Sequence, residues 1–210
     1  MRQYRQLCGV SLALDRVGER WTLLIVRDLL LGPRRYTDLL DGLPGITTNL
    51  LARRLKHLVE LDLVVQRSLP PPSGSTVYEL TDAGRTLEPV VLALGAFGAQ
   101  YIPGAGPDCA RDPRWPMVSM MRRYRGLEEP LVVGWTVGDR DYRLEGGDRM
   151  TVTDGSPEAA DLRIRTPERA FFALVSGKAR ARELRNAGAL EVEGRIADLN
   201  RLLSSLGMKP

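Results

Sequence analysis

Hydrophobic residues follow a helical period in the first half of the chain. Within residues 47–59, Leu51, Leu55 and Leu58 recur at four- and three-residue spacing and form one apolar stripe. Thr47 precedes the stripe, and its hydroxyl is suited to accept a backbone N–H left unpaired in the first turn. The pattern predicts an amphipathic helix that begins directly after Thr47.

The segments on either side of this helix complete a recognisable order. Residues 36–40 predict a short helix that is entered through Gly32-Pro33 and ends near residues 41–42. Residues 63–67 and 76–80 predict two strands joined by a turn-rich loop, and Thr81 is suited to cap a further helix. Helix, turn, helix and β-hairpin wing in this order are typical of a DNA-reading domain.

The polar face of the predicted recognition helix is basic and carries no acid between residues 47 and 59. Arg and Asn are the side chains that make bidentate contacts to guanine and adenine edges, and the N-terminal end of such a helix enters the major groove. Arg34 and Arg35 stand where phosphate contacts are expected, and Arg67 is the cation of the wing. The alternative is a solvated basic face. The predicted DNA contacts are Arg34, Arg35, Tyr36, Thr47, Thr48, Asn49, Ala52, Arg53, Lys56 and Arg67.

A second helix, predicted over residues 89–99, is apolar almost all round. Such a helix must be covered on every side, and a small winged-helix domain has too little surface for that. We expect it to pack against a second copy of the chain, with Leu92 and Phe97 in the interface and the helix around residues 11–17 as its companion. The alternative is that the second domain covers it.

Several motifs in residues 5–100 together resemble the HxlR family of winged helix-turn-helix transcription regulators. They are Trp21-Thr22-Leu23-Leu24-Ile25, Gly32-Pro33-Arg34-Arg35-Tyr36, Leu43-Pro44-Gly45-Ile46, the run from Leu51 to Leu58, and Tyr78-Glu79-Leu80-Thr81-Asp82-Ala83-Gly84. The resemblance implies a homodimer that binds an inverted repeat, usually as a repressor. It also matches Cys8 to a cysteine that some members use as a redox sensor, although Gly9 replaces the usual proline. We expect a partly buried, unreactive Cys8; a redox regulator keyed by Cys8 is the alternative.

The second half of the chain has a different character. Residues 103–116 are rich in Pro, Gly and charge and predict a linker between a domain at 1–102 and another at 117–210. Beyond it, alternating apolar and polar residues predict strands, and helices are expected around them. The predicted strands are 135–137, 141–144, 150–153, 162–166 and 189–193, and the predicted helices are 117–124, 167–175, 179–186 and 196–206. An antiparallel meander with helices on one face makes the chain an α+β protein.

This half resembles the sterol-carrier-protein-like (type 2) domain through residues 160–166, 171–178 and 188–194. The resemblance implies an apolar tunnel that binds lipid-like molecules, and methionines suit a variable ligand. The predicted pocket residues are Met117, Met120, Met121, Trp135, Tyr142, Phe171 and Phe172. The alternatives are that these side chains only fill the core, or that the domain has lost its cavity and serves dimer assembly.

Composition restricts the function further. The net charge of +4 is compatible with nucleic acid, and the absence of a long apolar run or signal-like start predicts a cytoplasmic protein without a membrane span. His57 is the single histidine and lies on the recognition helix, so neither a catalytic triad nor a His/Cys zinc site is expected. We therefore expect a non-enzymatic regulator without cofactor or metal, whose partners are double-stranded DNA, a second copy and a hydrophobic effector. The alternative function is a carrier of lipids or hydrophobic metabolites.

Overall fold

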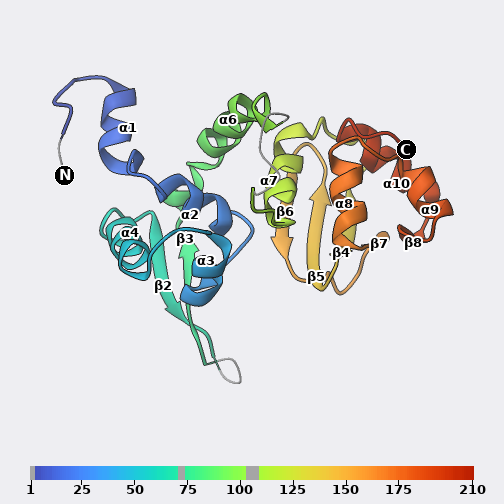
Figure 1. Ribbon diagram of the computed structural model, residues 1–210, viewed down its shortest axis with the longest axis horizontal. Helices are drawn as coiled ribbons and strands as arrows, with labels where there is room; N and C mark the ends of the chain where they lie inside the picture. Colours follow the sequence, from blue (N-terminus) through green and yellow to red (C-terminus); the bar gives the residue numbers. More distant parts are fainter. Residues whose placement is uncertain (1–2, 71–73, 103–108) are drawn as a thin grey trace. The chain divides into compact units, whose positions relative to one another are not determined.

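The computed structural model describes residues 3–70, 74–102 and 109–210. The chain divides into two compact units, Met1–Gly104 and Ala105–Pro210 (Figure 1). Residues 103–108 of the predicted linker lie outside the described residues. Its last three positions are helical, because a helix already begins at Arg114.

The first unit is a helical domain with a three-stranded sheet. The sheet has the order β1-β3-β2 and both pairings are antiparallel. The elements are α1 (Gly9–Val17), α2 (Thr22–Leu29), β1 (Arg34–Arg35), α3 (Tyr36–Gly42), α4 (Thr48–Glu60), β2 (Val64–Ser68), β3 (Thr76–Leu80), α5 (Asp82–Arg85) and α6 (Glu88–Ala99).

The apolar stripe of α4 faces the core of this unit, as its spacing predicted. Leu51, Leu55 and Leu58 are at most 1% exposed, and burial of each such side chain stabilises the fold by about 1.5–3 kcal/mol. The predicted cap is confirmed, because Thr47 Oγ1 accepts the backbone N–H of Leu50 at 3.4 Å. Because one face is fixed in the core, the other faces solvent.

The short helix α5 holds the wing close to the helical part of the unit. Thr81 caps α5 by accepting the N–H of Gly84 at 3.0 Å, and its own hydroxyl donates to the Asp62 carbonyl at 2.6 Å. A Cβ at Gly84 would lie 1.9 Å from the carbonyl oxygen of Leu63. Only glycine allows this approach, so α5 fixes where the first strand of the wing begins.

The second unit is a five-stranded sheet with helices. Two prolines lie at the start of α7, where a missing N–H is tolerated. The elements are α7 (Arg114–Arg123), β4 (Leu131–Val137), β5 (Arg140–Gly146), β6 (Met150–Asp154), β7 (Leu162–Thr166), α8 (Glu168–Val175), α9 (Ala181–Asn186), β8 (Glu191–Gly194) and α10 (Ile196–Ser205).

The sheet is not the antiparallel meander that the sequence predicted. Its order is β6-β5-β4-β7-β8, and β7 pairs with β4 in parallel, with Trp135 opposite Ile164. Asp161 fixes the start of this pairing: its N–H donates to the Val132 carbonyl at 2.9 Å, and its carboxylate accepts the Val132 N–H at 2.8 Å. Alternation along a strand identifies its buried face but neither its neighbour nor its direction.

Candidate nucleic-acid interface

The exposed face of α4 carries the residues expected to read DNA. Thr48, Asn49, Ala52, Arg53 and Lys56 are all exposed. Lys56 lies 3.9 Å from Glu60 in an exposed pair one turn on, which is a weak interaction. Within residues 3–70, 74–102 and 109–210, Arg53 takes part in no ion pair. The guanidinium of Arg53 is therefore available to an external partner.

Helix α3 fixes the N-terminal end of α4. The Tyr36 hydroxyl donates to the carbonyl oxygen of Thr48 at 2.7 Å, and the Tyr36 side chain is half-buried. Tyr36 was predicted as a DNA contact. Its hydroxyl is engaged between the two helices, which gives it a positioning role in this structure.

The two arginines before α3 differ in their surroundings. Arg34 is half-buried, and its Nε donates to the carbonyl oxygen of Asp28 at 3.4 Å. Arg35 is exposed, and its backbone N–H donates to the Asp38 carboxylate at 3.1 Å. Of this pair, Arg35 has the side chain that can reach a phosphate without rearrangement.

The wing carries its cation in an ion pair. Arg67 Nη2 lies 2.7 Å from Glu79 Oε2, and the other oxygen of Glu79 lies 4.0 Å from Arg85. Residues 71–73, at the predicted loop of the hairpin, lie outside the described residues. The carboxylate of Glu79 offsets part of the positive charge that the wing presents.

Two further side chains of α4 attach it to the end of α1 and to the turn that follows. Arg54 Nη2 lies 2.5 Å from Glu19 Oε2, and Arg54 Nε donates to the Arg20 carbonyl at 3.2 Å. His57 Nε2 lies 3.3 Å from the carbonyl oxygen of Arg16. Sequence reasoning missed these attachments, because their partners are mainly backbone carbonyls, which carry no residue-specific signal.

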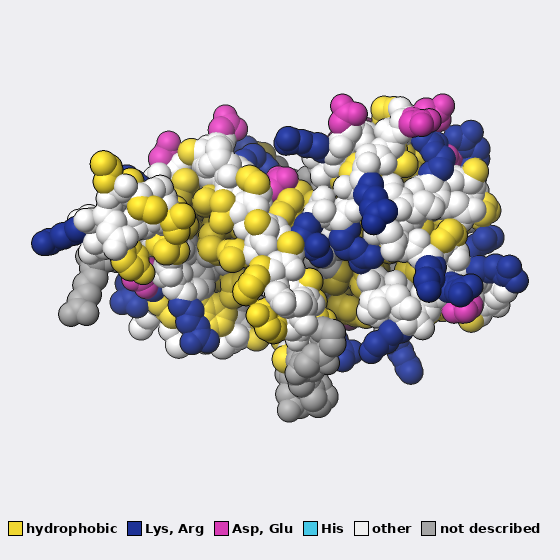
Figure 2. Space-filling view, turned by 90° about the horizontal axis from the view of Figure 1, so that it is seen from above, with side chains coloured by type: hydrophobic (Ala, Val, Ile, Leu, Met, Phe, Trp, Pro, Cys, Tyr) yellow, Lys and Arg dark blue, Asp and Glu magenta, His cyan; other side chains and the backbone are white. Residues whose placement is uncertain are grey.

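A wide apolar surface lies on the same unit, on α1, α6 and the residues next to them. Figure 2 shows it as yellow side chains gathered over this part of the molecule. Phe97 is 64% exposed and stacks edge-on against Tyr101, which is 62% exposed. The large apolar side chains exposed here are Tyr4, Leu7, Val10, Leu12, Leu14, Val90, Leu94, Phe97, Tyr101 and Ile102.

The predicted interface residues behave differently within α6. Phe97 is exposed, whereas Leu92 is half-buried within its own chain. Val91 is the buried residue of the helix. An apolar surface of this extent is uncommon on a monomeric protein.

The expectation of a partly buried Cys8 is wrong. Cys8 is an exposed free cysteine directly before α1. Hydrogen bonding from the backbone at Ser11, and then at Val10, lowers the pKa of its thiol. Hydrogen bonds to the thiolate stabilise the charged form, which is the nucleophilic form.

The predicted pocket residues of the second unit lie in or beside its core. Met117, Met120, Trp135, Tyr142 and Phe171 are at most 1% exposed, and Met121 and Phe172 are half-buried. The rings of Trp135 and Phe171 pack edge-on with centroids 5.5 Å apart, and Trp135 Nε1 donates to Thr166 Oγ1 at 3.0 Å. Helix α8 is thereby joined to β4.

The hydroxyl of Tyr142 is buried and makes no hydrogen bond to any described residue. Burial raises the pKa of Tyr142 from 10.0 to about 12, because the ionised form is disfavoured there. An unsatisfied buried hydroxyl costs free energy unless a water or ligand binds it.

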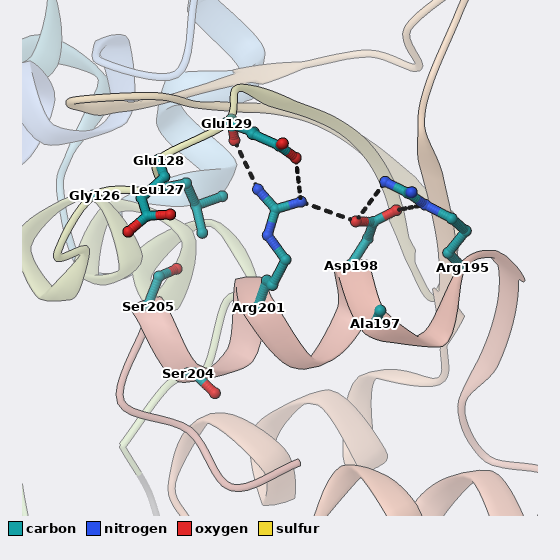
Figure 3. Close-up of a pocket in the computed structure, with 10 residues that line it drawn as sticks. All are labelled: Gly126, Leu127, Glu128, Glu129, Arg195, Ala197, Asp198, Arg201, Ser204 and Ser205. Atoms are coloured by element: carbon teal, nitrogen blue, oxygen red, sulfur yellow. Dashed lines mark hydrogen bonds and ion pairs between the residues drawn. The ribbon is translucent and has the colours of Figure 1, made fainter.

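A hollow of about 660 Å³ opens elsewhere on the second unit, between α10 and the segment before β4. Figure 3 shows Arg201 reaching from α10 towards Glu129, with Asp198 between Arg201 and Arg195. Asp198 is 2% exposed, and its carboxylate accepts from Arg195 at 2.8 Å and from Arg201 at 3.1 Å. This lining is charged, and none of the predicted pocket residues belongs to it.

The described parts of the chain carry neither a metal-binding cluster nor a membrane-spanning helix. No group of three or more His, Cys, Asp or Glu side chains there is arranged to hold a metal ion. No described helix is both long and apolar enough to cross a membrane.

The recognition helix, its supporting helix and the β-hairpin define a winged helix-turn-helix DNA-binding domain. Residues 16–105 match the HxlR-like helix-turn-helix family. The chain belongs to this family of transcription regulators.

Individual relatives agree with this assignment. The chain is 32% identical over 105 residues to the uncharacterized HTH-type transcriptional regulator sll1512 of Synechocystis, covering 50% of this chain and 77% of that one. It is 33% identical over 89 residues to the HTH-type transcriptional regulator YodB of Bacillus subtilis. This match covers 42% of this chain and 80% of that protein. For MT3179 of Mycobacterium tuberculosis the identity is 42% over 95 residues, covering 45% and 60%.

Solved structures of similar sequence include two regulators. The reduced form of YodB from B. subtilis is 29% identical with a TM-score of 0.41, covering 48% of this chain and 100% of that one. The oxidised form of the redox regulator HypR is 28% identical with a TM-score of 0.42, covering 50% and 99%.

Proposed function

We propose that the protein is a homodimeric repressor that reads an inverted-repeat operator through α4. The main support for this proposal is that the first unit presents two surfaces. One is the basic, acid-poor face of α4, and the other is the wide apolar face on α1 and α6. The first face suits DNA and the second suits a second copy of the chain. A twofold dimer places two reading helices on successive major grooves, roughly 34 Å apart.

Repression by occupancy follows if the operator overlaps a promoter. The test is a gel shift with the DNA upstream of the protein's own gene, compared with random DNA of equal length. We expect a specific complex that contains two chains for each operator. A protein that binds both fragments equally, or neither, contradicts operator reading and favours the alternative of a carrier of hydrophobic molecules.

A second candidate role, ligand sensing by the second unit, is favoured by Tyr142. Its buried hydroxyl makes no hydrogen bond to any described residue, and a mainly hydrophobic molecule with one polar group would satisfy it. Such a ligand acts on DNA binding only if it prefers one of two conformations. Titration of the full-length protein with an anilinonaphthalene sulfonate dye, whose fluorescence rises in apolar surroundings, tests this role.

The dye experiment needs a variant in which the core is filled. Val152, 1% exposed on β6, offers such a position, and Val152→Phe should reduce dye binding if a cavity is used. The apolar face of α6 can also bind dye, so Phe97→Asp serves as the matched control. Dye binding that Phe97→Asp abolishes and Val152→Phe leaves unchanged contradicts a ligand site in the second unit.

Redox response through Cys8 is the third candidate role. Cys8 is exposed, its pKa is lowered, and it stands directly before a helix of the apolar face. Oxidation at this position would change the surface that we assign to the dimer.

A further inference from the structure

The second unit carries a cluster of cations around α9. Four of them fall within residues 178–185, and backbone pairing brings the fifth beside them, because Ala181 N–H donates to the Lys209 carbonyl at 3.3 Å. All five side chains are exposed. The α9 basic cluster consists of Lys178, Arg180, Arg182, Arg185 and Lys209.

The cluster is not neutralised from within the second unit. Among the described residues, none of its five side chains takes part in an ion pair. Glu183 is the acid within residues 178–185. Its carboxylate accepts the backbone N–H of Arg180 at 2.9 Å and so caps the start of the helix. Arg182 and Arg185 are three positions apart on α9, where like charges repel and weaken a helix.

Several cations on the sheet of this unit are placed beside acids. Arg143 pairs with Glu145 on β5. On the neighbouring strands, Arg163 stands opposite Glu193 and Arg165 opposite Glu191. These strand cations lie beside acids, whereas the five cations of the α9 basic cluster are concentrated on α9 and the residues next to it. Figure 2 shows dark blue side chains grouped over the right-hand part of the view.

We propose that the α9 basic cluster is a second DNA-binding surface that contacts phosphates outside the major groove read by α4. This rests on the DNA-binding function of the family. Lys and Arg side chains bind phosphate oxygens with charge-assisted hydrogen bonds, and duplex DNA offers a dense row of them. Contacts of this kind strengthen binding to every sequence and extend the length of duplex that one protein covers.

An anionic membrane is the competing polyanion. Membrane-surface binding normally combines cations with apolar side chains that enter the lipid. Among the described residues of the second unit, a single large hydrophobic side chain is exposed, that of Ile196 at 37%. This unit therefore offers charge without apolar insertion, and DNA fits it better.

The test compares two triple variants of the full-length protein. Arg180→Gln/Arg182→Gln/Arg185→Gln removes three cluster charges, and Arg149→Gln/Arg165→Gln/Arg169→Gln removes three exposed charges from outside it. Affinity for a random-sequence duplex of about 60 base pairs is measured over a range of salt concentrations. Each lost phosphate contact reduces the slope of log K against log salt by about 0.9.

We expect the cluster variant to lose about 2 to 3 in slope and at least about tenfold in affinity at low salt, with the control variant unchanged. A second variant, Lys178→Gln/Lys209→Gln, changes no helical residue and should lose slope by about 2. Thermal unfolding followed by circular dichroism checks that each variant is folded.

Three results overturn the inference. The first is that the cluster variant keeps the wild-type salt slope, and the second is that both triple variants lose slope equally. The third comes from cosedimentation with phosphatidylserine vesicles: the cluster variant binds vesicles less than wild type but binds DNA equally well. If the wild-type protein binds no DNA, the proposed function fails before any variants are compared. If wild type binds and only the cluster effect is missing, the proposed function stands without this surface.

Discussion

Arg67 and Glu79 form an ion pair diagonally across the wing. Arg67 stands opposite Val77 in the hairpin, yet its Nη2 lies 2.7 Å from Glu79 Oε2. The wing therefore carries its cation next to an acid that would itself be repelled by DNA.

This pairing predicts that Glu79→Gln raises the affinity for DNA. The substitution frees Arg67 from an exposed pair worth about 0–1 kcal/mol and removes a negative charge, so we expect an increase of up to about fivefold at low salt. Fluorescence anisotropy with random duplex measures it. Arg67→Gln is the matched variant and should lower affinity; unchanged affinity in both would exclude the wing from the contact.

Substitutions at Arg53 and Arg35 should have different effects, because we expect Arg53 to contact a base and Arg35 to contact a phosphate. Arg53→Ala is expected to weaken operator binding by about 1–3 kcal/mol and to relax specificity, because a base contact is lost. Arg35→Ala should weaken all sequences alike and reduce the salt slope by about 0.9. Gel shifts across salt concentrations decide between them. Equal loss on operator and random DNA for Arg53→Ala would place this side chain on a phosphate.

Dimerisation through α6 predicts a strong effect at Phe97. Phe97→Asp would bury an unpaired charge in the interface, at a cost of roughly 3–5 kcal/mol. The variant should be monomeric by light scattering and lose operator binding. Val65→Asp, an exposed apolar position on β2, is the control and should remain dimeric. A folded Phe97→Asp protein that stays dimeric would move the interface away from α6.

Cys8 should react as an activated thiol. Because its pKa is lowered, the thiolate is present at lower pH than in an unfolded chain. In a Cys109→Ser background, alkylation by iodoacetamide should reach half its maximal rate at lower pH in the native protein than in denaturant. If the redox role holds, diamide abolishes operator binding of this protein and leaves that of Cys8→Ser intact. Equal sensitivity of the two proteins would count against it.

Tyr142 predicts a pH dependence with a definite sign. Its pKa is raised from 10.0 to about 12 in the folded state. The contribution of Tyr142 to the free energy of unfolding is therefore fully present below pH 10. It is lost as the pH rises towards 12, because the tyrosine of the unfolded chain ionises first. Tyr142→Phe should remove this decrease in the free energy of unfolding between pH 10 and 12. At neutral pH the free energy of unfolding should be equal to that of wild type or higher. Urea unfolding at several pH values measures the difference; a large loss at neutral pH would show that the hydroxyl is satisfied after all.

The first unit was predictable because its signals are local. A cap at Thr47 and a leucine stripe specify α4 from a few adjacent positions, and the exposed face follows from the buried one. The apolar character of α6 predicted an uncovered surface for the same reason. The half-buried setting of Arg34 was not visible, because its Nε donates to the Asp28 carbonyl, a group that any residue could supply.

The second unit shows where such reasoning ends. Its strands overlap the predicted ranges, although β4 begins earlier, at Leu131, than the predicted strand 135–137. The parallel pairing of β4 with β7 depends on contacts between distant segments. The exposure of Cys8 likewise depends on what packs around it, which the residues next to it in sequence do not specify. Backbone hydrogen bonding at the start of α1 lowers its pKa, and no residue pattern specifies this effect.

The parallel pairing has a consequence for incomplete chains. Strand β4 is central in the finished sheet, with β5 on one side and β7 on the other. A polypeptide that stops before Leu162 can still form the hairpins of β4, β5 and β6, but one whole edge of β4 then has unpaired backbone groups. Apolar strand edges of this kind recruit other chains. Fragments produced by early termination or by cleavage before β7 should therefore aggregate, whereas the complete unit keeps that edge covered.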